Sequence, residues 1–576
     1  PYTTLFRSGQ TAAKEVKVPA SWADAVDGEK PELKLNTVNA EQDAYVRNIL
    51  IPTNNLEGDA LPVSAFLPYA TGKVPSGTAA FEKRGIAVDI PVWHAENCTQ
   101  CNWCSTVCPH AVIRPYILKE EDAEGLTTVD CKTAPGKKFF IGVSAEDCTG
   151  CGSCVEMCPA RGKALSMERS AGRMFQDQEN FEYAKKKGVQ QGSDKTVKEA
   201  QFLRPYLEYS GACPGCGETP YAKMVTQLFG DHAIIANATG CSSIWGASVP
   251  SMPYVVDENG RGPAWANSLF EDNAEFGYGM SVSMRTRRTA LRNTVERLAK
   301  NPAFAGTAGA WLEKMNTPEA NHLGEYLVAL CKVYADNEDA QYIIKNADLL
   351  PRPSMWIFGG DGWAYDIGYG GLDHILASRE NFNVLVFDTE VYSNTGGQSS
   401  KATPTGAVAQ FAAGGKPTPK KRLAEIAMTS GHVYVAQVAI GANPAQTLKA
   451  LREAESYDGP SLIIAYAPCI NHGLKAGMNR SMVEMKKAVR AGYWNLMRFD
   501  PRLAEAGKNP LQIDSAKPNE DYQSFLKGEV RYASLTMKNP AHAAMLYEES
   551  EKSAKDRYDS LIQKRNSLEP KEGLAK

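Results

Sequence analysis

The chain has 576 residues, of which 43% are hydrophobic and 22% charged, so it is long enough to form more than one domain with a buried core. Its formal net charge of -3 gives no electrostatic reason to expect binding to nucleic acid or to an anionic membrane. No apolar run approaches the length of a membrane span, and the 14 cysteines fit a reducing compartment in which thiols serve as metal ligands. We therefore expect a cytoplasmic protein with no nucleic-acid and no membrane partner.

Residues 1–90 are predicted to be a linker and the tail of a preceding domain. The chain lacks an initiator methionine, and residues 1–8 resemble translated sequencing adapter, so they are excluded from fold reasoning. The rest of this stretch is rich in Pro, Gly, Ala and charged residues, and only residues 45–52 form a compact apolar run. We therefore expect the chain to be a fragment of a longer protein.

Residues 91–170 contain two copies of the spacing Cys-x2-Cys-x2-Cys-x3-Cys-Pro. Three thiolates in one tight loop suit three corners of a [4Fe–4S] cubane, whereas the cysteine before the proline ligates the other cluster. Zinc is the alternative, but it usually takes two cysteines from each of two separated loops. The spacing predicts a small α+β ferredoxin-like domain that moves single electrons. The predicted ligands are Cys98, Cys101, Cys104 and Cys158 for one cluster, and Cys148, Cys151, Cys154 and Cys108 for the other.

Residues 171–200 are polar and rich in Lys and Gln, and are predicted to be a connector. A second domain is predicted over residues 201–475, where short apolar runs alternate with helical patterns, and residues 476–576 are predicted to be a helical carboxyl-terminal extension. Continuous apolar strands separated by helices indicate an α/β domain with a mostly parallel sheet, whose ligands gather at the carboxyl ends of the strands. The predicted strands are 231–238, 355–359, 383–388, 433–440 and 462–467, with helical patterns such as 368–379 and 444–457.

A Gly-Asp-Gly turn, Gly360 to Gly362, directly follows the predicted strand 355–359. Its backbone amides can approach a diphosphate, and Asp361 can hold a divalent cation that bridges the two phosphates. One strand later, residues 388–398 are rich in the hard oxygen ligands that Mg²⁺ prefers. A Gly-Asp-Gly turn on its own is an ordinary β-turn about as often as it is a cofactor-binding turn. With the polar loop one step downstream it resembles the thiamine-diphosphate motif, although Thr389 stands where that motif often has Asn.

Four further cysteines lie in the second domain. Cys213 and Cys216 form a Cys-x2-Cys pair at its start, whereas Cys241 and Cys469 each follow a predicted strand. Isolated buried thiols and a zinc site are the alternatives. The number of these cysteines and their position at strand ends favour a third [4Fe–4S] cluster.

Taken together, these motifs resemble the carboxyl-terminal half of single-chain pyruvate:ferredoxin (flavodoxin) oxidoreductase, from residues 75–87 to residues 528–535. The resemblance implies that the third cluster, held by Cys213, Cys216, Cys241 and Cys469, lies next to thiamine diphosphate. It implies Mg²⁺ ligands from Asp361, Thr389 and the backbone oxygen of Val391. It implies cofactor contacts from Glu218, Cys241, Gly360, Gly362, Trp363 and Asn394, and it makes Asn394, near the substrate, the predicted catalytic residue.

The resemblance also implies an activity. Pyruvate would be oxidatively decarboxylated with coenzyme A to acetyl-CoA and CO2, and electrons would pass from thiamine diphosphate through three [4Fe–4S] clusters to ferredoxin or flavodoxin. The family suggests a homodimer, and its activating carboxylate comes from an amino-terminal domain that residues 1–90 do not offer. Two alternatives stay open, namely another 2-oxoacid:ferredoxin oxidoreductase and a non-catalytic iron–sulfur electron-transfer module.

Solitary features carry less weight. Cys131 and Cys331 fit no pattern and are predicted to be structural. His472, close after Cys469, is predicted to cap a turn rather than to tune a cluster. The basic segment 284–300 and the mixed-charge segment 548–564 are predicted to be solvated helix faces.

Overall fold

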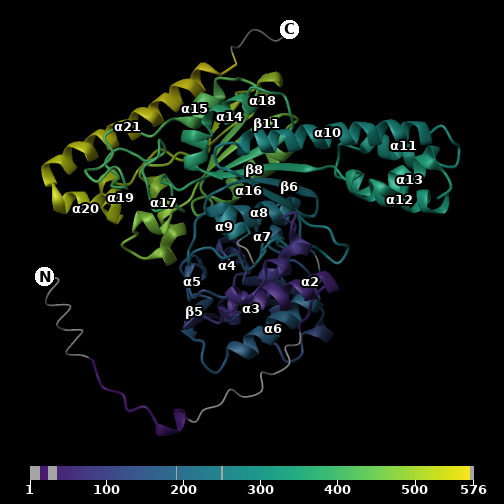
Figure 1. The fold of residues 1–576 in the computed structure, drawn as a ribbon. Helices are drawn as coiled ribbons and strands as arrows, with labels where there is room; N and C mark the ends of the chain where they lie inside the picture. The colour runs from purple at the N-terminus through teal and green to yellow at the C-terminus, as the bar shows by residue number, and fades with distance from the viewer. Residues whose placement is uncertain (1–12, 24–34, 190, 248–250, 571–576) are drawn as a thin grey trace.

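The computed structural model describes residues 13–23, 35–189, 191–247 and 251–570, so the prediction for residues 1–8 lies outside the described residues. Figure 1 shows a lower body, which holds the N-terminal helices and the cysteine-rich module, and an upper body built around a large sheet. The C-terminal helices cover one side of the upper body, and a helical arm extends from its other side.

The segment predicted to be a linker contains helices. Asn39 caps α2 (Ala40–Tyr45) by accepting a hydrogen bond of 2.8 Å from the Gln42 backbone N–H. The chain continues through a π-helical turn into α3 (Ile51–Asn54). The apolar run noted in the sequence therefore packs into a small core of its own rather than staying extended. Its buried members are Tyr45, Val46, Ile49 and Leu50.

The cysteine-rich module has the predicted α+β character. β1 (Asp89–Trp93) pairs antiparallel with β5 (Leu165–Arg169), so the two ends of the module lie together. A three-stranded antiparallel sheet forms between the two cysteine loops, and short helices carry the third cysteine of each loop. These elements are β2 (Ile113–Leu118), β3 (Val129–Asp130), β4 (Lys138–Val143), α4 (Trp103–Val107) and α5 (Ser153–Glu156).

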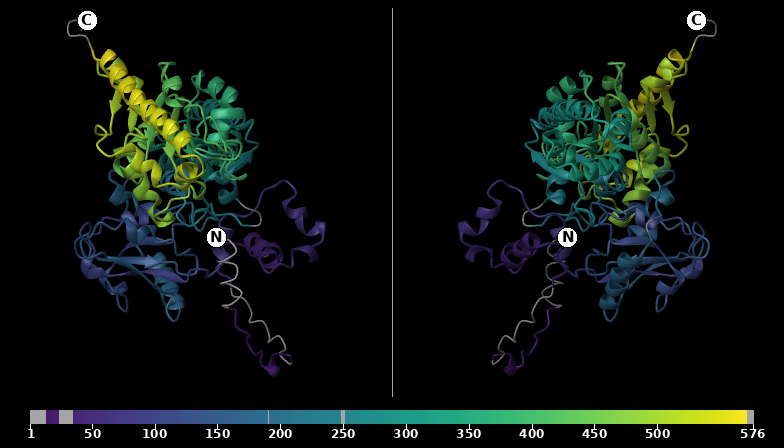
Figure 2. Two further views of the ribbon diagram at one scale, coloured as in Figure 1. Left: turned by 90° about the vertical axis from the view of Figure 1, so that its left-hand side faces the viewer. Right: turned by 90° about the vertical axis from the view of Figure 1, so that its right-hand side faces the viewer.

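The predicted connector is largely a helix. α6 (Met174–Lys187) follows the module, and its buried side chains Phe181 and Ala184 pack against β4. Only this narrow face of α6 is apolar, so the segment is polar overall. Its polar composition therefore favours a connector when the sequence is considered alone. α6 belongs to the cysteine-rich module, and Figure 2 shows this module beside the N-terminal helices in the lower body.

The upper body contains one eight-stranded sheet with the order β13-β12-β10-β11-β9-β8-β6-β7. The strands from β10 to β7 run parallel, whereas β12 and β13 run antiparallel at one edge. Every residue of β9 and β11 is buried, as expected for parallel strands covered on both faces. The strands are β6 (Ala233–Ala238), β7 (Ala264–Ser268), β8 (Ser354–Gly360), β9 (Phe382–Asp388), β10 (Tyr434–Val438), β11 (Pro460–Tyr466), β12 (Met497–Phe499) and β13 (Leu511–Ile513).

The predicted helical extension also supplies sheet. β12 and β13 lie after residue 475, so the sheet crosses the predicted domain boundary. α21 is the long yellow helix of Figures 1 and 2, and only part of its surface is exposed to solvent as predicted. Its other face packs on the upper body, because Leu546, Tyr547 and Leu561 are buried. The helices of this body are α7 (Val197–Ala200), α8 (Thr219–Phe229), α9 (Cys241–Gly246), α14 (Tyr369–Leu376), α15 (Leu423–Met428), α16 (Pro444–Ser456), α17 (Ser481–Arg490), α18 (Pro501–Glu505), α19 (Tyr522–Lys527), α20 (Val530–Lys538) and α21 (Pro540–Ser567).

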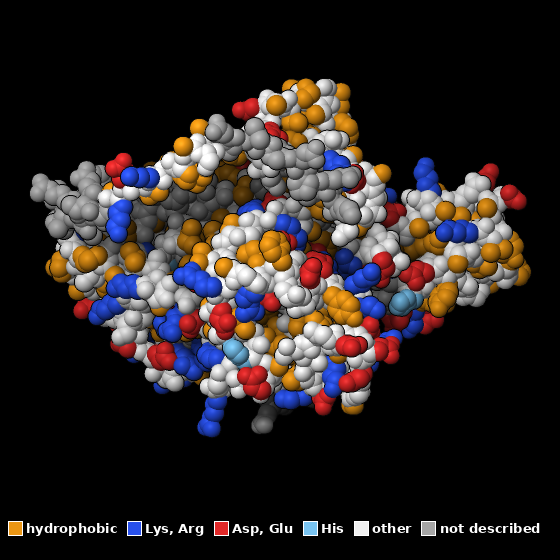
Figure 3. All heavy atoms as spheres, turned by 90° about the horizontal axis from the view of Figure 1, so that it is seen from below, with side chains coloured by type: hydrophobic (Ala, Val, Ile, Leu, Met, Phe, Trp, Pro, Cys, Tyr) orange, Lys and Arg blue, Asp and Glu red, His pale blue; other side chains and the backbone are white. Residues whose placement is uncertain are grey.

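The helical arm is an insertion between β7 and β8. It consists of α10 (Asn273–Leu298), α11 (Ala305–Lys314), α12 (Ala320–Val333) and α13 (Glu338–Lys345). A separate hydrophobic core, which includes Trp311 and Cys331, holds its helices together. In the described part of the chain no helix is long and apolar enough to cross a membrane. Seen from below, the molecule shows Lys and Arg interleaved with Asp and Glu (Figure 3).

Candidate cofactor and electron-transfer sites

Four adjacent strands deliver predicted site residues to one edge of the sheet. β11, β9, β8 and β6 are neighbours and run parallel, so their carboxyl ends meet at the same edge (Figure 1). Cys469 follows β11, Thr389 follows β9, Asp361 follows β8 and Cys241 follows β6. The topology thus brings the predicted metal ligands and two of the predicted third-cluster cysteines to one place.

The three predicted Mg²⁺ ligands converge on one another. The hydroxyl oxygen of Thr389 lies 3.0 Å from Asp361 Oδ1 and 3.0 Å from the Val391 carbonyl oxygen. A hydroxyl carries one proton, so it can donate to only one of these two acceptors. All three residues are buried. Such a buried group of oxygens, with fewer protons than acceptors, has the donor chemistry of a hard divalent cation site.

Acidic groups predominate around these oxygens. Asp388 and Glu390 flank Thr389 and are buried, and Lys420 Nζ lies 2.7 Å from Asp388 Oδ2 and 3.0 Å from Glu390 Oε1. Burial and the Asp388 carboxylate raise the pKa of Asp361 well above its usual value. Against burial, Lys420 and a second cation, Arg531, lower the pKa of Glu390 to about 2. A bound divalent cation would favour the ionised form of Asp361.

The glycine turn leaves room beside this site. A Cβ at Gly360 would meet nothing closer than the Phe387 carbonyl oxygen, 4.0 Å away, whereas a Cβ at Gly362 would collide with the Tyr392 ring. Trp363 is buried, and its indole N–H has no hydrogen-bond partner among the described atoms. Asn394 is exposed in the loop after β9. The structure therefore places the turn and the loop at the same strand ends, with the Trp363 ring in the core.

The four cysteines predicted for the third cluster surround a buried carboxyl group. The Trp245 indole N–H donates to Glu218 Oε2 over 2.6 Å, and burial raises the pKa of Glu218 to about 7. Burial first, and the Glu218 carboxylate after it, raise the pKa of all four thiols. Cys241 Sγ lies 3.1 Å from Ser393 Oγ, and the Glu218 backbone N–H donates to Cys216 Sγ over 3.4 Å. These thiols are brought together from the N-terminal loop of the domain and from two strand ends.

The ferredoxin-like cysteines group in the crossed arrangement. Burial raises the pKa of Cys104, and the next causes are Cys101, Cys98 and, further down, Cys158 from the other loop. The pKa of Cys154 is raised by burial first, and then by its loop partners Cys151 and Cys148 and by Cys108 from the first loop. Backbone N–H groups donate to the sulfurs of Cys98, Cys148 and Cys158 over 3.4, 3.4 and 3.3 Å. Donors aimed at sulfur are the polar environment that a cluster-bound thiolate needs.

No set of three or more His, Cys, Asp or Glu side chains among the described residues is arranged to hold a single metal ion. The cysteine sets and the Mg²⁺ ligands stay predictions.

The third-site loop touches the ferredoxin-like module. Burial and then Cys108 raise the pKa of Cys151, and the Gly215 backbone N–H, between Cys213 and Cys216, acts on this thiol in the opposite direction. His110, two residues after Cys108, lies with Nε2 at 2.8 Å from the Ala212 carbonyl oxygen. The cluster predicted at Cys148, Cys151, Cys154 and Cys108 is therefore the neighbour of the third site.

Sequence reasoning missed a buried lysine between the cysteine sites. Lys223 on α8 is 3% exposed, and its ammonium donates to the Ser105 carbonyl and, at 3.3 Å, to the Thr106 carbonyl. Burial lowers the pKa of Lys223 to about 8, while Cys108 and Cys104 act in the opposite direction. A lone cation within the apolar pattern of residues 219–229 is the sequence signal that could have revealed it.

Sequence reasoning also missed the groups that support the metal loop. His472 does not cap a turn with its side chain, because its ring is fully buried and Nε2 lies 2.7 Å from the Thr389 carbonyl oxygen. Arg531 donates to Glu390 Oε2 over 2.8 Å and to Glu529 Oε2 over 2.6 Å. Nothing in a sequence pattern links residues so far apart in the chain, so only the fold reveals these contacts.

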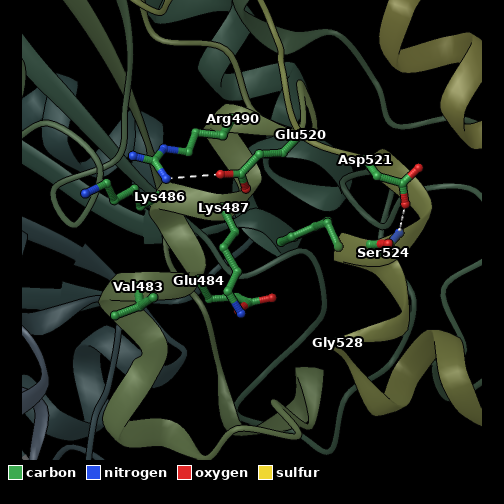
Figure 4. A pocket seen from close by; sticks show the side chains of 10 residues that line it. Val483, Glu484, Lys486, Lys487, Arg490, Glu520, Asp521, Ser524 and Gly528 are labelled. Carbon is green, nitrogen blue, oxygen red and sulfur yellow. Dashed lines mark hydrogen bonds and ion pairs between the residues drawn. The ribbon is translucent and has the colours of Figure 1, made fainter.

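Two of the larger pockets have none of the predicted thiamine-diphosphate, Mg²⁺ or third-cluster residues in their lining. A pocket of about 470 Å³ lies between α17 and α19, and Figure 4 shows its charged side chains. Arg490 pairs with Glu520 at 3.0 Å, and Asp521 caps α19 by accepting from the Ser524 N–H over 2.6 Å (Figure 4). Its lining includes none of the predicted site residues. The second of these pockets is a groove that borders the ferredoxin-like module.

Comparison with known families matches three regions of the chain. Residues 97–163 match a 4Fe-4S dicluster domain, and residues 344–465 match the C-terminal TPP-binding domain of thiamine pyrophosphate enzymes. Residues 32–87, where a linker was predicted, match EKR, a domain of unknown function.

Similar proteins extend over nearly the whole chain. Pyruvate:ferredoxin oxidoreductase from Moorella thermoacetica is 52% identical over 95% of this chain and 48% of its own length. Pyruvate-flavodoxin oxidoreductase from Klebsiella pneumoniae is 49% identical over 96% of this chain and 47% of its own length. The mitochondrial pyruvate dehydrogenase [NADP(+)] of Euglena gracilis is 47% identical over 92% of this chain and 30% of its own length. The chain thus spans about half the length of the first two relatives and 30% of the length of the third.

The predicted resemblance to pyruvate:ferredoxin (flavodoxin) oxidoreductases is confirmed by these matches. The predicted fold class is confirmed as well, because a TPP-binding domain with a mostly parallel sheet follows a 4Fe-4S domain. The predicted oxidoreductase class agrees with the names of the relatives. The ligand assignments and domain boundaries stay predictions.

Proposed function

We propose that this chain carries the thiamine diphosphate, Mg²⁺ and three [4Fe–4S] sites of a pyruvate oxidoreductase. In this proposal pyruvate and coenzyme A give acetyl-CoA and CO2, and two electrons leave singly to ferredoxin or flavodoxin. The names of the relatives support pyruvate and the acceptors, and the family matches support the clusters and thiamine diphosphate. Coenzyme A, the homodimer and the cytoplasmic location rest on the sequence resemblance.

The observation that carries the proposal is the meeting of two kinds of site at one sheet edge. Asp361, Thr389 and Val391 present converging oxygens at the ends of β8 and β9. Cys241 and Cys469 follow the flanking strands β6 and β11. A diphosphate-binding metal site and a cysteine site so placed bring an organic cofactor next to a one-electron acceptor, which an isolated electron-transfer module does not require.

The chain's own residues would bind and orient the cofactors. Asp361, Thr389 and Val391 would hold Mg²⁺, and His472 would fix the Thr389 backbone through its 2.7 Å contact. Glu218 would place a buried acid, whose pKa is raised by burial, beside the cysteines. When bound, thiamine diphosphate supplies the electron sink for decarboxylation, and each [4Fe–4S] cluster accepts one electron at a time.

The contacts between the sites support an order for electron transfer. The loop of Cys213 and Cys216 touches Cys151, so the cluster that includes Cys151 would follow the third site. Cys104 is among the groups that raise the pKa of Cys154, so the two ferredoxin-like sites are neighbours in turn. The cluster of Cys98, Cys101, Cys104 and Cys158 would then be last.

Several apolar side chains near this edge of the sheet are exposed. They support the proposal that another part of the protein covers it. Ile244, Ile470 and Leu269 follow strand ends and are 48%, 53% and 60% exposed, and Phe411 is 94% exposed. Exposed apolar groups around a cofactor site commonly mark an interaction surface. We propose that another protein region covers this edge and supplies the carboxylate that activates thiamine diphosphate.

The test is anaerobic reconstitution of the chain with iron, sulfide, Mg²⁺ and thiamine diphosphate. We expect calorimetry to show Mg²⁺-dependent binding of thiamine diphosphate. We expect pyruvate with coenzyme A to reduce the clusters when the chain is joined to the part of the Moorella relative that it does not match. Binding with no pyruvate-dependent reduction but with reduction by another 2-oxo acid would favour the related oxidoreductases. Absence of thiamine diphosphate binding would favour the electron-transfer module.

A further inference from the structure

A groove of about 740 Å³ lies where the ferredoxin-like module meets the upper body. One wall is the first cysteine loop, with Cys101 and Trp103, and the opposite wall is the start of α16. The segment 195–198 forms the third side. The Asn102 side chain donates to the Lys198 carbonyl oxygen over 2.9 Å, so this segment is fixed to the cysteine loop.

The groove is lined by cations. Lys195, Lys198, Lys449 and Arg452 all face it, and no Asp or Glu belongs to its lining. Arg452 pairs with Asp194 at 2.9 Å, and Lys449 lies 3.8 Å from Glu453. Lys195 and Lys198 have no carboxylate within ion-pair distance in the described part of the chain. The rim therefore keeps a positive charge that a partner with acidic side chains would complement.

Beneath the cations the groove is apolar. Trp103 and Val197 are half-buried, Leu448 and Pro444 are buried, and all four line it. An apolar centre inside a charged rim is the usual composition of a protein interface, and aromatic residues are enriched at such centres. A small anion would need the cations but not this apolar floor. The composition favours a protein surface as the occupant.

The groove also reaches a predicted cluster. Cys101 lines it and is half-buried, so its thiolate would bring one corner of the last cluster to the floor of the groove. The other predicted ferredoxin-like cluster lies beside the Cys213 loop, because His110 Nε2, two residues after Cys108, is 2.8 Å from the Ala212 carbonyl oxygen. An electron leaving the last cluster through this corner would reach a partner bound in the groove directly.

We propose that this groove docks the acidic face of a single-electron carrier protein. The inference rests on the proposed function, because it requires the cluster at Cys101. In the transfer the reduced cluster loses one electron and the redox centre of the carrier gains it, and no covalent bond forms or breaks. Lys195 and Lys198 steer and hold the carrier, and Trp103 packs against it.

The test uses the reconstituted chain, reduced with dithionite and freed of excess reductant by anaerobic gel filtration. It is mixed in a stopped-flow instrument with oxidised bacterial flavodoxin, an acidic carrier, and flavin absorbance is followed. The variant is Lys195→Glu with Lys198→Glu. The matched control, Lys332→Glu with Lys345→Glu, reverses two exposed lysines on the helical arm and changes the net charge equally. Oxidised methyl viologen serves as a small cationic acceptor.

We expect the groove variant to reduce flavodoxin at least about tenfold more slowly at low ionic strength, with the difference fading in high salt. Its reduction of methyl viologen and the behaviour of the control variant should match the parent chain. Equal flavodoxin rates in the groove variant and parent would overturn the docking surface. An equal loss in the control would do so too, because the effect would then belong to overall charge.

Two further outcomes separate this inference from the proposed function. A chain that takes up no iron, or whose clusters accept no electrons from dithionite, would refute the proposed function and the groove's role with it. If the double variant fails to fold, Lys195→Glu alone replaces it, because that side chain is exposed and makes no ion pair within the described residues. The single variant should then show a smaller, salt-dependent loss, and an unchanged rate would overturn the inference.

Discussion

Replacing Arg531 with methionine should destabilise the loop that carries the predicted Mg²⁺ ligands. Arg531 is 4% exposed, and its guanidinium joins Glu390 at 2.8 Å to Glu529 at 2.6 Å. Methionine has a similar length and fills the space, but it leaves both carboxylates buried without this partner. Glu390 stands between Thr389 and Val391, so the loss acts directly on the loop.

The expected loss in unfolding free energy is about 3 kcal/mol. Removing one partner of a buried ion pair typically costs about 3–5 kcal/mol, because an uncompensated charge stays inside. The lower end applies here because Lys420 still contacts Glu390 Oε1 at 3.0 Å. Adding Glu390→Gln to Arg531→Met should recover part of the loss, since the double variant no longer buries that unpaired charge.

The measurement is urea unfolding followed by tryptophan fluorescence, with Arg285→Met as the control. Arg285 pairs with Glu380 at 2.8 Å, but its side chain is 63% exposed, so its loss should cost less than about 1 kcal/mol. A loss in Arg531→Met no larger than that of the control would refute the reasoning. So would a double variant less stable than the single one.

Four other outcomes are expected. Iron and sulfide analysis should give about twelve of each per chain, and a reproducible value near eight would exclude the third cluster. Asp361→Ala should abolish calorimetric binding of thiamine diphosphate while the iron content stays unchanged, because it removes a metal ligand outside the cysteine loops. Lys223→Met should lower the midpoint potential of a ferredoxin-like cluster in an EPR-monitored redox titration, since a buried positive charge favours the reduced form; an unchanged potential would contradict this. Against burial, Lys185 and Arg114 lower the pKa of Glu208 from 4.5 to about 2. Its stabilisation, about 3 kcal/mol, is therefore complete above pH 4.5 and lost as the pH falls toward 2. Glu208→Gln should be less stable than the parent near neutrality and approach it in acid, and a pH-independent difference would contradict the assignment.

Much of this architecture could be predicted from local patterns. The strand 383–388 predicted from its apolar run is β9 (Phe382–Asp388), and the helical pattern 444–457 is α16 (Pro444–Ser456). Cysteine spacing predicts the ligand sets because a cubane constrains residues that are close in sequence, and residues 97–163 match a 4Fe-4S dicluster domain. In the same way, Asp361 and Thr389 could be placed together because adjacent parallel strands end at the same edge.

What could not be predicted depends on contacts between distant segments. β12 and β13 are three residues long each, so their short runs carry little signal, and they extend the sheet because β12 pairs with β10 and β13 pairs with β12. α6 has a polar composition because only two of its buried side chains, Phe181 and Ala184, are apolar. Lys223 contacts Ser105 and Arg531 contacts Glu390, and in both pairs the partners are more than 100 residues apart in the sequence.

The spread of the third site's cysteines along the chain has a consequence for biosynthesis. Cys213 opens the thiamine domain and Cys469 follows its strand β11, with the entire helical arm between them. A ribosome adding about 5–20 residues per second needs on the order of ten to fifty seconds to travel that interval. Both ferredoxin-like loops leave the ribosome well before this interval is synthesised. In the proposed assignment, the third cluster can assemble only after Cys469 has been synthesised and the sheet has formed, so Cys213 and Cys216 wait that long for their partner ligands.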